Sequence, residues 1–472
     1  MNHGYAIINP DPRGVYNSEG NIYAFGTQEG RDGADVIDWI GAQSWSNGKV
    51  GMSGNSYLAI SQWFIAAEQP KHLAAIAPWE GSSDFFREAS PGGVLSKPAL
   101  DFSLQIFSVN VGKGTWENPV AGTLSSQIAM DYVEDKSAKL EKIQVPAYVV
   151  ASWSNPIHSY GTFRAFSRLQ TPKWLRVHDS WEWPDYYTEA NRTDLHRFYD
   201  YYLKGIDNGW PITPQFRGKI IDTASPLPLT GTNLVASSYP PPEAKPLKLF
   251  FHPASETLES TYPTRSSASF TGKGEDLMFE YTFTGPAIVC GPLDARLAVS
   301  LHGGTDANIF ITTEKVLSSG AAGKQLKIPY SSAVQSRLIR LIASSGLVPV
   351  TSLLKYSGPW GKIHVSRRSM VEDEKAPGMP ICRMDTVMPL EDGQIDIVKV
   401  PMVPMGMRFA AGEKLRVVLS GKDKEVYPPV DQATLQVVDV PDPNSGGVEV
   451  EIHAGLESKL ASEITLQVIK DW

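Results

Sequence analysis

Hydrophobic positions in the first part of the chain alternate between short continuous apolar runs and longer stretches with helical spacing. Continuous apolar runs are typical of strands buried on both faces, and apolar residues three or four positions apart are typical of helices. The predicted strands are 49–53, 73–77, 146–153 and 174–178, and the predicted helices are 33–43, 57–67 and 193–204. Strands that alternate with helices predict a parallel, doubly wound sheet.

One stretch, residues 84–140, interrupts this alternation. Its pattern is mixed, with helical pieces at 99–109 and 122–135. We expect it to form a helical cap that lies over the ends of the strands.

The pattern changes again after Trp210. Prolines punctuate the chain there, and residues 448–452 and 464–468 alternate strictly between apolar and polar positions. Alternation of period two predicts strands with one wet face, and many such strands form a sandwich or barrel. A chain of 472 residues is also too long for one core. We therefore predict an α/β domain at 1–211, with 84–140 as its insertion, and an all-β sandwich at 212–472.

Composition narrows the classes of function. The net charge is −8, and no cluster of Lys and Arg supplies the basic face that a nucleic-acid partner needs. No apolar run approaches the ~18 residues that span a membrane, and no signal peptide is visible at Met1, which favours a cytoplasmic location. Cys290 and Cys382 lack metal-ligand spacing and are expected to be buried thiols. We expect no metal and no cofactor. The chain can be a monomer or a homo-oligomer, and the sequence does not decide between them.

The segment Val50 to Ala59 carries the candidate chemistry. It reads as a strand that runs into Gly54-Asn55-Ser56 and a helix that leaves from Tyr57. Such a turn holds the serine hydroxyl exposed at the strand end, and it directs the backbone N–H of the next residue toward a developing oxyanion. The strict G-x-S-x-G pattern fails because position 58 is Leu. Taken alone, the motif fits a turn serine that caps a helix equally well.

Motifs around the elbow show a family resemblance. They include Asp11-Pro12-Arg13-Gly14, Glu29-Gly30-Arg31-Asp32-Gly33, Gly54-Asn55-Ser56-Tyr57-Leu58-Ala59, Leu203-Lys204-Gly205-Ile206-Asp207-Asn208-Gly209 and Phe409-Ala410-Ala411-Gly412-Glu413. In these motifs the chain resembles the cocaine-esterase/NonD branch of serine hydrolases, which is related to X-prolyl dipeptidyl peptidases. That family's elbow is G-x-S-Y-x-G, so only its last Gly is changed here, to Ala59.

The resemblance implies an α/β-hydrolase domain followed by a jelly-roll (galactose-binding-like) sandwich that closes one side of the active site. It implies Ser56 as the nucleophile and the N–H of Tyr57 as an oxyanion donor. Family members carry earlier strands and a Pro-Tyr segment that supplies a second donor, and no matching segment precedes Tyr5. We therefore expect a truncated chain or a smaller sheet, with ~10²–10³-fold lower turnover for a lost donor.

The base and the acid are harder to place. His178 ends the last predicted strand, where this fold carries its base, although the family's G-P-W-x-H loop puts the histidine a few residues later. His158 follows the previous strand and is interpreted as structural. The family's W-x-D acid reads Trp153-Ser154-Asn155 here. An Asp-to-Asn change in another serine hydrolase costs roughly 10⁴-fold in turnover.

Three explanations of this change stay open. Asn155 acts as a neutral orienter of His178, another carboxylate (Asp179, Glu182 or Asp185) takes the acid position, or the triad is degenerate. The predicted function is a serine hydrolase that cleaves a small ester or amide through an acyl-enzyme. The alternatives are an X-Pro dipeptidyl-peptidase-like activity and a catalytically impaired homologue that acts as a binding protein.

Overall fold

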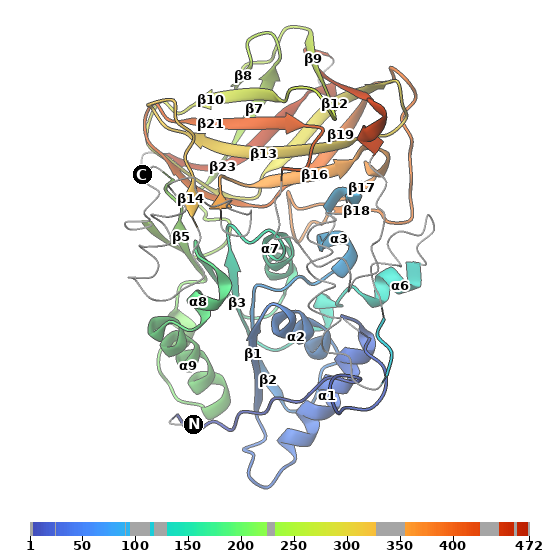
Figure 1. The fold of residues 1–472 in the computed structure, drawn as a ribbon. Helices are drawn as coiled ribbons and strands as arrows, with labels where there is room; N and C mark the ends of the chain where they lie inside the picture. The colour runs from blue at the N-terminus through green and yellow to red at the C-terminus, as the bar shows by residue number, and fades with distance from the viewer. Residues whose placement is uncertain are drawn as a thin grey trace, which may run out of the picture.

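A computed structural model of the protein describes residues 3–23, 25–89, 91–94, 114–117, 130–223, 232–326, 355–424, 443–456 and 460–470. The first half is built on a six-stranded sheet (Figure 1). Its strands, in spatial order, are β1 (Val50–Asn55), β2 (Leu73–Trp79), β3 (Ala147–Ser152), β4 (Lys173–His178), β5 (Phe216–Ile220) and β6 (Thr232–Ala236). The first five strands are parallel and β6 is antiparallel, which confirms the predicted α/β class.

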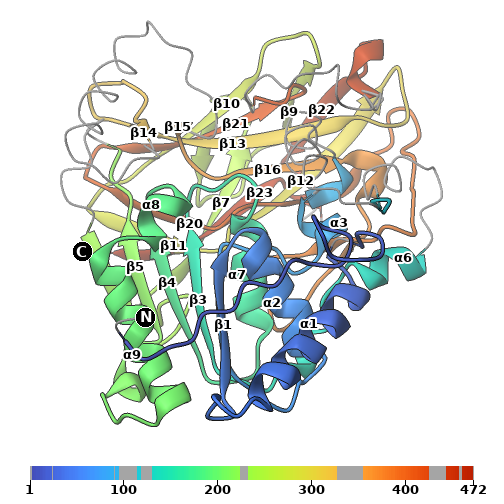
Figure 2. The ribbon, with the colours of Figure 1, turned by 60° about the horizontal axis from the view of Figure 1, so that its bottom comes forward.

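Helices cover both faces of this sheet (Figure 2). They are α1 (Thr27–Gly41), α2 (Tyr57–Ala67), α3 (Phe85–Ala89), α6 (Met130–Asp135), α7 (Ser159–Arg168), α8 (Glu182–Tyr186) and α9 (Glu189–Lys204), with 3₁₀ turns η1 (Pro91–Gly93), η2 (Leu140–Lys142) and η3 (Trp210–Ile212). Every residue of β3 is buried, as expected for a central strand of a two-faced parallel sheet. Its alternate side chains therefore enter two different cores.

The two cores have different helices. Val149 and Ala151 pack into the core that holds the apolar residues of α2 and α7. Tyr148 and Val150 pack into the core that holds α9, with Phe198 at its centre. Because side chains of a strand alternate between its faces, this single strand ties both helical layers together.

The first sheet extends beyond residue 211, where the predicted domain boundary lies. Strands β5 and β6 follow that point in the chain, yet they pair with β4 and with each other. The strand pairing changes from the first sheet to the second between Ala236 and Lys245. The domain boundary predicted at residue 211 stays a prediction, and the change of sheet follows it in the chain.

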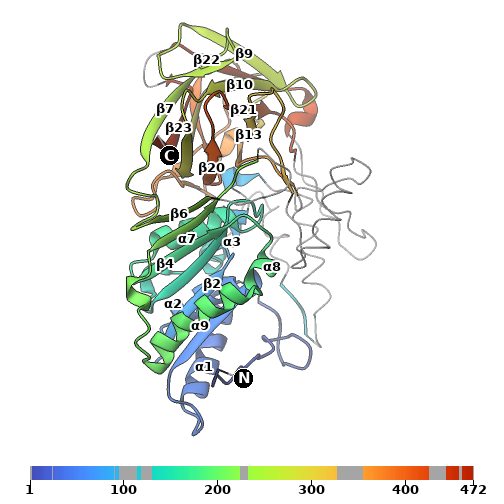
Figure 3. The ribbon, with the colours of Figure 1, turned by 90° about the vertical axis from the view of Figure 1, so that its left-hand side faces the viewer.

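The second half forms a 13-stranded, mainly antiparallel sheet that packs as a β-sandwich (Figure 3). Its strands are β7 (Lys245–His252), β8 (Thr257–Glu259), β9 (Ser266–Thr271), β10 (Leu277–Thr282), β11 (Ala287–Gly291), β12 (Asp294–His302), β13 (Asn308–Val316), β16 (Trp360–His364), β19 (Asp396–Pro401), β20 (Met405–Phe409), β21 (Lys414–Ser420), β22 (Glu449–Ala454) and β23 (Glu463–Lys470). Two separate antiparallel pairs accompany it, β14 (Gln325–Leu326) with β15 (Lys355–Tyr356) and β17 (Met370–Val371) with β18 (Ile381–Cys382). The second half also holds the 3₁₀ turns η4 (Val365–Arg367) and η5 (Pro443–Gly446). The predicted sandwich is confirmed.

The sandwich packs against the carboxyl-terminal end of the first sheet. The buried Trp153 ring, just after β3, fills the place where a Cβ on Gly406 of β20 would lie, with ring atoms 2.1 Å from that position. The backbone N–H of Ile221 donates to the Gly406 carbonyl at 2.9 Å. The two halves thus share a continuous core, and the strand ends that carry the candidate site lie beside it.

The predicted cap is described only in part. Residues 95–113 and 118–129 lie outside the described residues, and the helical piece expected at 99–109 lies there too. In the described part, Phe86 of α3 and Val133 of α6 pack with Cys382 and Met384 of the second half. Both cysteines are buried free thiols, as predicted. Within the described ranges, no helix is long and apolar enough to cross a membrane.

Candidate active site

Ser56 occupies a strained turn between β1 and α2. Its φ is 57° and its ψ is −123°, a backbone conformation that residues other than glycine rarely adopt. The Ser56 N–H donates to the carbonyls of Trp79 and Glu80 at 3.2 and 3.1 Å, which fixes the turn to the end of the neighbouring strand. Gly54 is required because a Cβ there would lie 2.4 Å from the Leu58 Cβ. This is the geometry of a nucleophile elbow.

The Ser56 hydroxyl meets His158. The distance from Ser56 Oγ to His158 Nε2 is 3.1 Å, within hydrogen-bond range. His158 immediately precedes α7 and is buried. Burial lowers the pKa of His158 to about 4, although the negative charge of Glu80 acts in the opposite direction. The imidazole is therefore neutral near pH 7, the form in which a histidine can accept a proton.

The other ring nitrogen of His158 has no such contact. Nδ1 is buried and finds no hydrogen-bond partner among the described residues. In a serine hydrolase triad this nitrogen donates to an acidic group that fixes the tautomer. The orientation of His158 therefore comes from its backbone, whose N–H donates to Asn155 Oδ1 at 3.2 Å.

His178 lies at the end of β4, as its sequence position indicated, but its ring faces other groups. Its Nε2 is 2.5 Å from Glu80 Oε1, and the Ser180 N–H donates to its Nδ1 at 3.3 Å. Burial alone lowers the pKa of His178, but the charges of Asp185 and Glu80 outweigh it and hold the pKa above the ordinary value. These contacts occupy both ring nitrogens of His178, whereas the Ser56 hydroxyl contacts His158. The predicted role of His178 as base stays a prediction.

Asn155 also lies in the site, although its hydrogen bonds do not go to His178. Its Nδ2 donates to Glu80 Oε2 at 2.7 Å and to Glu182 Oε2 at 3.2 Å. Its Oδ1 accepts from the N–H groups of Ile157 and His158 at 2.9 and 3.2 Å. Asn155 thus joins two carboxyl groups to the backbone that leads into α7.

Glu80 is the functional candidate that sequence reasoning missed. It follows β2 directly, it is 1% exposed, and its φ of 57° makes it a second strained position at this sheet edge. Its carboxylate contacts His178 and Asn155 and acts electrostatically on His158. A glutamate that ends an apolar strand beside the nucleophile strand was the available signal.

The three other carboxylates considered from the sequence have different surroundings. Asp179 pairs with Lys219 at 2.8 Å. Asp185 pairs with Arg176, and its Oδ2 lies 3.8 Å from His178 Nε2. Only Glu182 joins the network around Asn155, and its burial, together with the charge of Glu80, holds its pKa well above the ordinary value.

Tyr57 begins α2, so its backbone N–H lies at the positive end of that helix. Its hydroxyl donates to Glu29 Oε1, and its ring contacts Phe25 with centroids 5.2 Å apart. Burial raises the pKa of Glu29 to about 6, while the bond from Tyr57 partly offsets this. The side chain thus anchors the first turn of α2 to α1. Its role as oxyanion donor stays a prediction.

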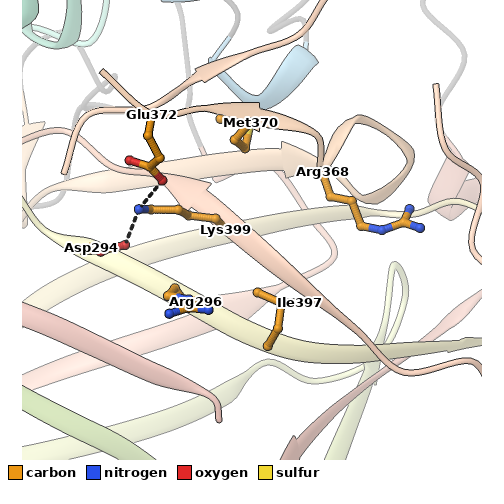
Figure 4. A pocket seen from close by; sticks show the side chains of 7 residues that line it. All are labelled: Asp294, Arg296, Arg368, Met370, Glu372, Ile397 and Lys399. Carbon is orange, nitrogen blue, oxygen red and sulfur yellow. Dashed lines mark hydrogen bonds and ion pairs between the residues drawn. The ribbon is translucent and has the colours of Figure 1, made fainter. Parts of the chain in front are cut away.

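The cavity in Figure 4 does not belong to this site. It encloses about 380 Å³ on the β-sandwich and is lined by Asp294, Arg296, Arg368, Met370, Glu372, Ile397 and Lys399. Its charged groups pair with their neighbours. Lys399 Nζ lies 3.2 Å from Asp294 and 2.5 Å from Glu372, and Arg368 pairs with Asp396.

Comparisons with known proteins agree with this architecture. Residues 1–181 match the family model "X-Pro dipeptidyl-peptidase (S15 family)", and residues 208–455 match "X-Pro dipeptidyl-peptidase C-terminal non-catalytic domain". The chain is 42% identical to cocaine esterase from Rhodococcus sp. (strain MB1 Bresler) over 99 residues, which is 21% of this chain and 17% of that protein. The match therefore spans less than a fifth of that relative's length.

Solved structures show the same fold. A CocE/NonD family hydrolase from Staphylococcus aureus superposes with a TM-score of 0.81 at 24% identity, covering 97% of this chain and 78% of that one. An α-amino acid ester hydrolase superposes with a TM-score of 0.64 at 16% identity, covering 97% and 84%. Since the second family model alone covers more than half of the sequence, the chain belongs to the X-Pro dipeptidyl-peptidase (S15) family.

Proposed function

We propose that this protein is a serine hydrolase that cleaves a small ester or amide through an acyl-enzyme, with Ser56 as nucleophile and His158 as general base. The observation that carries the proposal is the 3.1 Å contact between Ser56 Oγ and a buried, neutral His158 Nε2. A nucleophilic serine needs a base within hydrogen-bond reach. The family supports the reaction class, since its members are peptidases and esterases.

In the first step the Ser56 proton moves to His158 Nε2 as Oγ forms a bond to the substrate carbonyl carbon. The carbonyl oxygen becomes an oxyanion, which the Tyr57 N–H at the start of α2 stabilises. His158 then gives its proton to the leaving alcohol or amine as the bond to the carbonyl carbon breaks. Water attacks the acyl-enzyme in the same way, and the acid product leaves with Ser56 restored.

The buried charge of Glu80 supports this cycle. When His158 takes up the Ser56 proton, an imidazolium forms in a site where burial opposes charge. Glu80 is the negative group that acts on His158 and raises its pKa. It therefore favours the transient imidazolium without a direct bond to the ring, and in this proposal it replaces the charge of the family's W-x-D aspartate.

One observation favours a second candidate function, that of an impaired hydrolase that binds a ligand in the cleft. Among the described residues, His158 Nδ1 has no acceptor. A neutral ring with its proton on Nε2 would donate to Ser56 rather than accept from it, and the serine would stay unactivated. The X-Pro dipeptidyl-peptidase-like activity has no comparable support in the contacts of this site.

The test is intact-mass analysis after exposure to a fluorophosphonate probe, with hydrolysis of aryl esters measured in parallel. We expect one adduct on the native protein and none on Ser56→Ala, together with loss of ester hydrolysis in the variant. Ser53→Ala is the matched control, since Ser53 Oγ bonds to Tyr186 at 2.6 Å and lies on the same strand. A folded native protein that forms no adduct and hydrolyses no ester would refute the proposal and favour the binding protein.

A further inference from the structure

The Asn155 side chain uses both ends of its amide. Backbone N–H groups only donate, so the oxygen must face Ile157 and His158 and the NH₂ group must face Glu80 and Glu182. The residue is 8% exposed. An ionised aspartate in its place would accept from the backbone but would have no hydrogen to give to either carboxyl group.

We propose that Asn155 is a positioning residue that must stay neutral, because its NH₂ group holds two carboxyl groups while its oxygen fixes the turn that carries His158. The consequence for activity rests on the proposed function of Ser56 and His158. The position that holds an aspartate in the family pattern has a different task here, and restoring that aspartate is expected to impair the enzyme.

The charges around Asn155 explain why an aspartate at this position should impair the enzyme. Glu80 faces Asn155 from the end of β2 and Glu182 faces it from α8, and Glu80 also contacts His178. Burial and the charge of Glu80 already oppose ionisation of Glu182. A further carboxylate at position 155 would be repelled by Glu80 and would oppose ionisation of Glu182 still more. Asp185 and Arg176 balance each other at the far side of the network.

Substitution Asn155→Asp separates the two roles by the sign of its pH dependence. A protonated aspartic acid reproduces the amide, since its O–H donates to a carboxylate and its C=O accepts from the backbone. As pH rises this proton is lost and the new carboxylate is repelled by Glu80. The labelling rate of the variant relative to the native protein should therefore fall as pH rises. If position 155 were instead the missing acid, the ionised form would help and the variant should improve with pH.

The experiment measures the rate of fluorophosphonate labelling between pH 5.5 and 8.5 for the native protein, Asn155→Asp and Asn155→Ala. We expect Asn155→Asp to be about 10- to 100-fold slower at pH 8.5 and to approach the native rate at pH 5.5. Asn155→Ala should be slower by a factor that does not change with pH. A ratio of Asn155→Asp to native that rises with pH, or exceeds one, would overturn the proposal.

Asn444→Asp is the matched control for burying a carboxylate. Asn444 is 3% exposed, and its amide donates to the carbonyls of Asn308 and Gly421 in the sandwich. We expect this control to melt at a lower temperature while keeping the native labelling rate at every pH. A control whose labelling follows that of Asn155→Asp would overturn the proposal, because the effect would then be general destabilisation.

Melting temperatures keep the inference testable if the native protein is not labelled, which would refute only the proposed function. Asn155→Asp should lose more melting temperature between pH 5.5 and 8.5 than Asn444→Asp, because only position 155 faces two carboxyl groups. An equal or smaller loss would overturn the proposal. If Asn155→Asp fails to fold at any pH, unaltered labelling or melting of Asn155→Ala would overturn it, and a loss in both would support it.

Discussion

The pH dependence of Ser56 acylation distinguishes the two histidines. The pKa of His158 is lowered from 6.5 to about 4 by burial, whereas that of His178 is held above its ordinary value. A general base must be deprotonated to act. If His158 is the base, the labelling rate should fall on acidification with an apparent pKa near 4. If His178 is the base, the rate should fall on acidification with an apparent pKa above 6.5.

The difference is largest at mildly acid pH. At pH 5.5 a group with a pKa of about 4 is still ~97% neutral, whereas an ordinary histidine is only ~10% neutral. The native protein should thus keep nearly its full labelling rate at pH 5.5, with folding checked by circular dichroism at each pH. His158→Gln should lower the plateau rate by ~10²–10⁴-fold. His178→Gln leaves the Ser56–His158 contact in place and serves as the comparison.

The same shift predicts a stability effect of known sign. The unfolded chain binds a proton at His158 near pH 6.5 and the folded chain only near 4, so stability falls as pH drops through this window. A shift of this size corresponds to about 3 kcal/mol. His158→Gln should remove most of that loss in urea unfolding at pH 4.5 and 7.5. Labelling that titrates above pH 6.5, or a His158→Gln variant that labels normally, would refute the reasoning.

Two further substitutions test the elbow at Gly54 and the hydrogen bond that anchors Tyr57 to Glu29. Gly54→Ala places a Cβ 2.4 Å from the Leu58 Cβ, so the first turn of α2 must shift, and we expect labelling to slow by ~10²-fold or more while circular dichroism stays native; an unchanged rate would contradict the proposed fit. Tyr57→Phe removes a hydrogen bond to buried Glu29, whose pKa is about 6. In urea unfolding it should cost about 1–3 kcal/mol at pH 8 and less at pH 5, where the protonated Glu29 no longer carries a buried charge. An equal loss at both pH values would contradict this account.

Local patterns were sufficient for the architecture. The alternation of apolar runs and helical spacing indicated the parallel sheet, and the period-two runs indicated the sandwich, because each pattern reflects which faces of an element are buried. The elbow was equally local, since a strand, a small residue at Gly54 and a helix start at Tyr57 occur within a few residues. The family motifs added the likeness that the comparisons confirm.

The point at which the chain leaves the first sheet for the second could not be predicted from local patterns. The residues of β5 and β6 follow the prolines that suggested a change of domain, and nothing in their own sequence tells which sheet they join. Pairing depends on which strand edge the following segment reaches, and β5 pairs with β4 rather than with the other edge strand, β1. The predicted boundary at residue 211 therefore preceded the actual change of sheet.

The sequence by itself determined the fold class and the position of Ser56 in an elbow between a strand and a helix, and it has Asn155 where the family pattern has an acid. Only the tertiary structure decided which histidine reaches Ser56 and which carboxylate lies behind it. His158 and Ser56 are 102 positions apart, and Glu80 and His178 are 98 apart. Such contacts follow from the order of strands in the sheet and from the direction in which each strand end turns. Both are set by long-range packing, which a local pattern of residues does not encode.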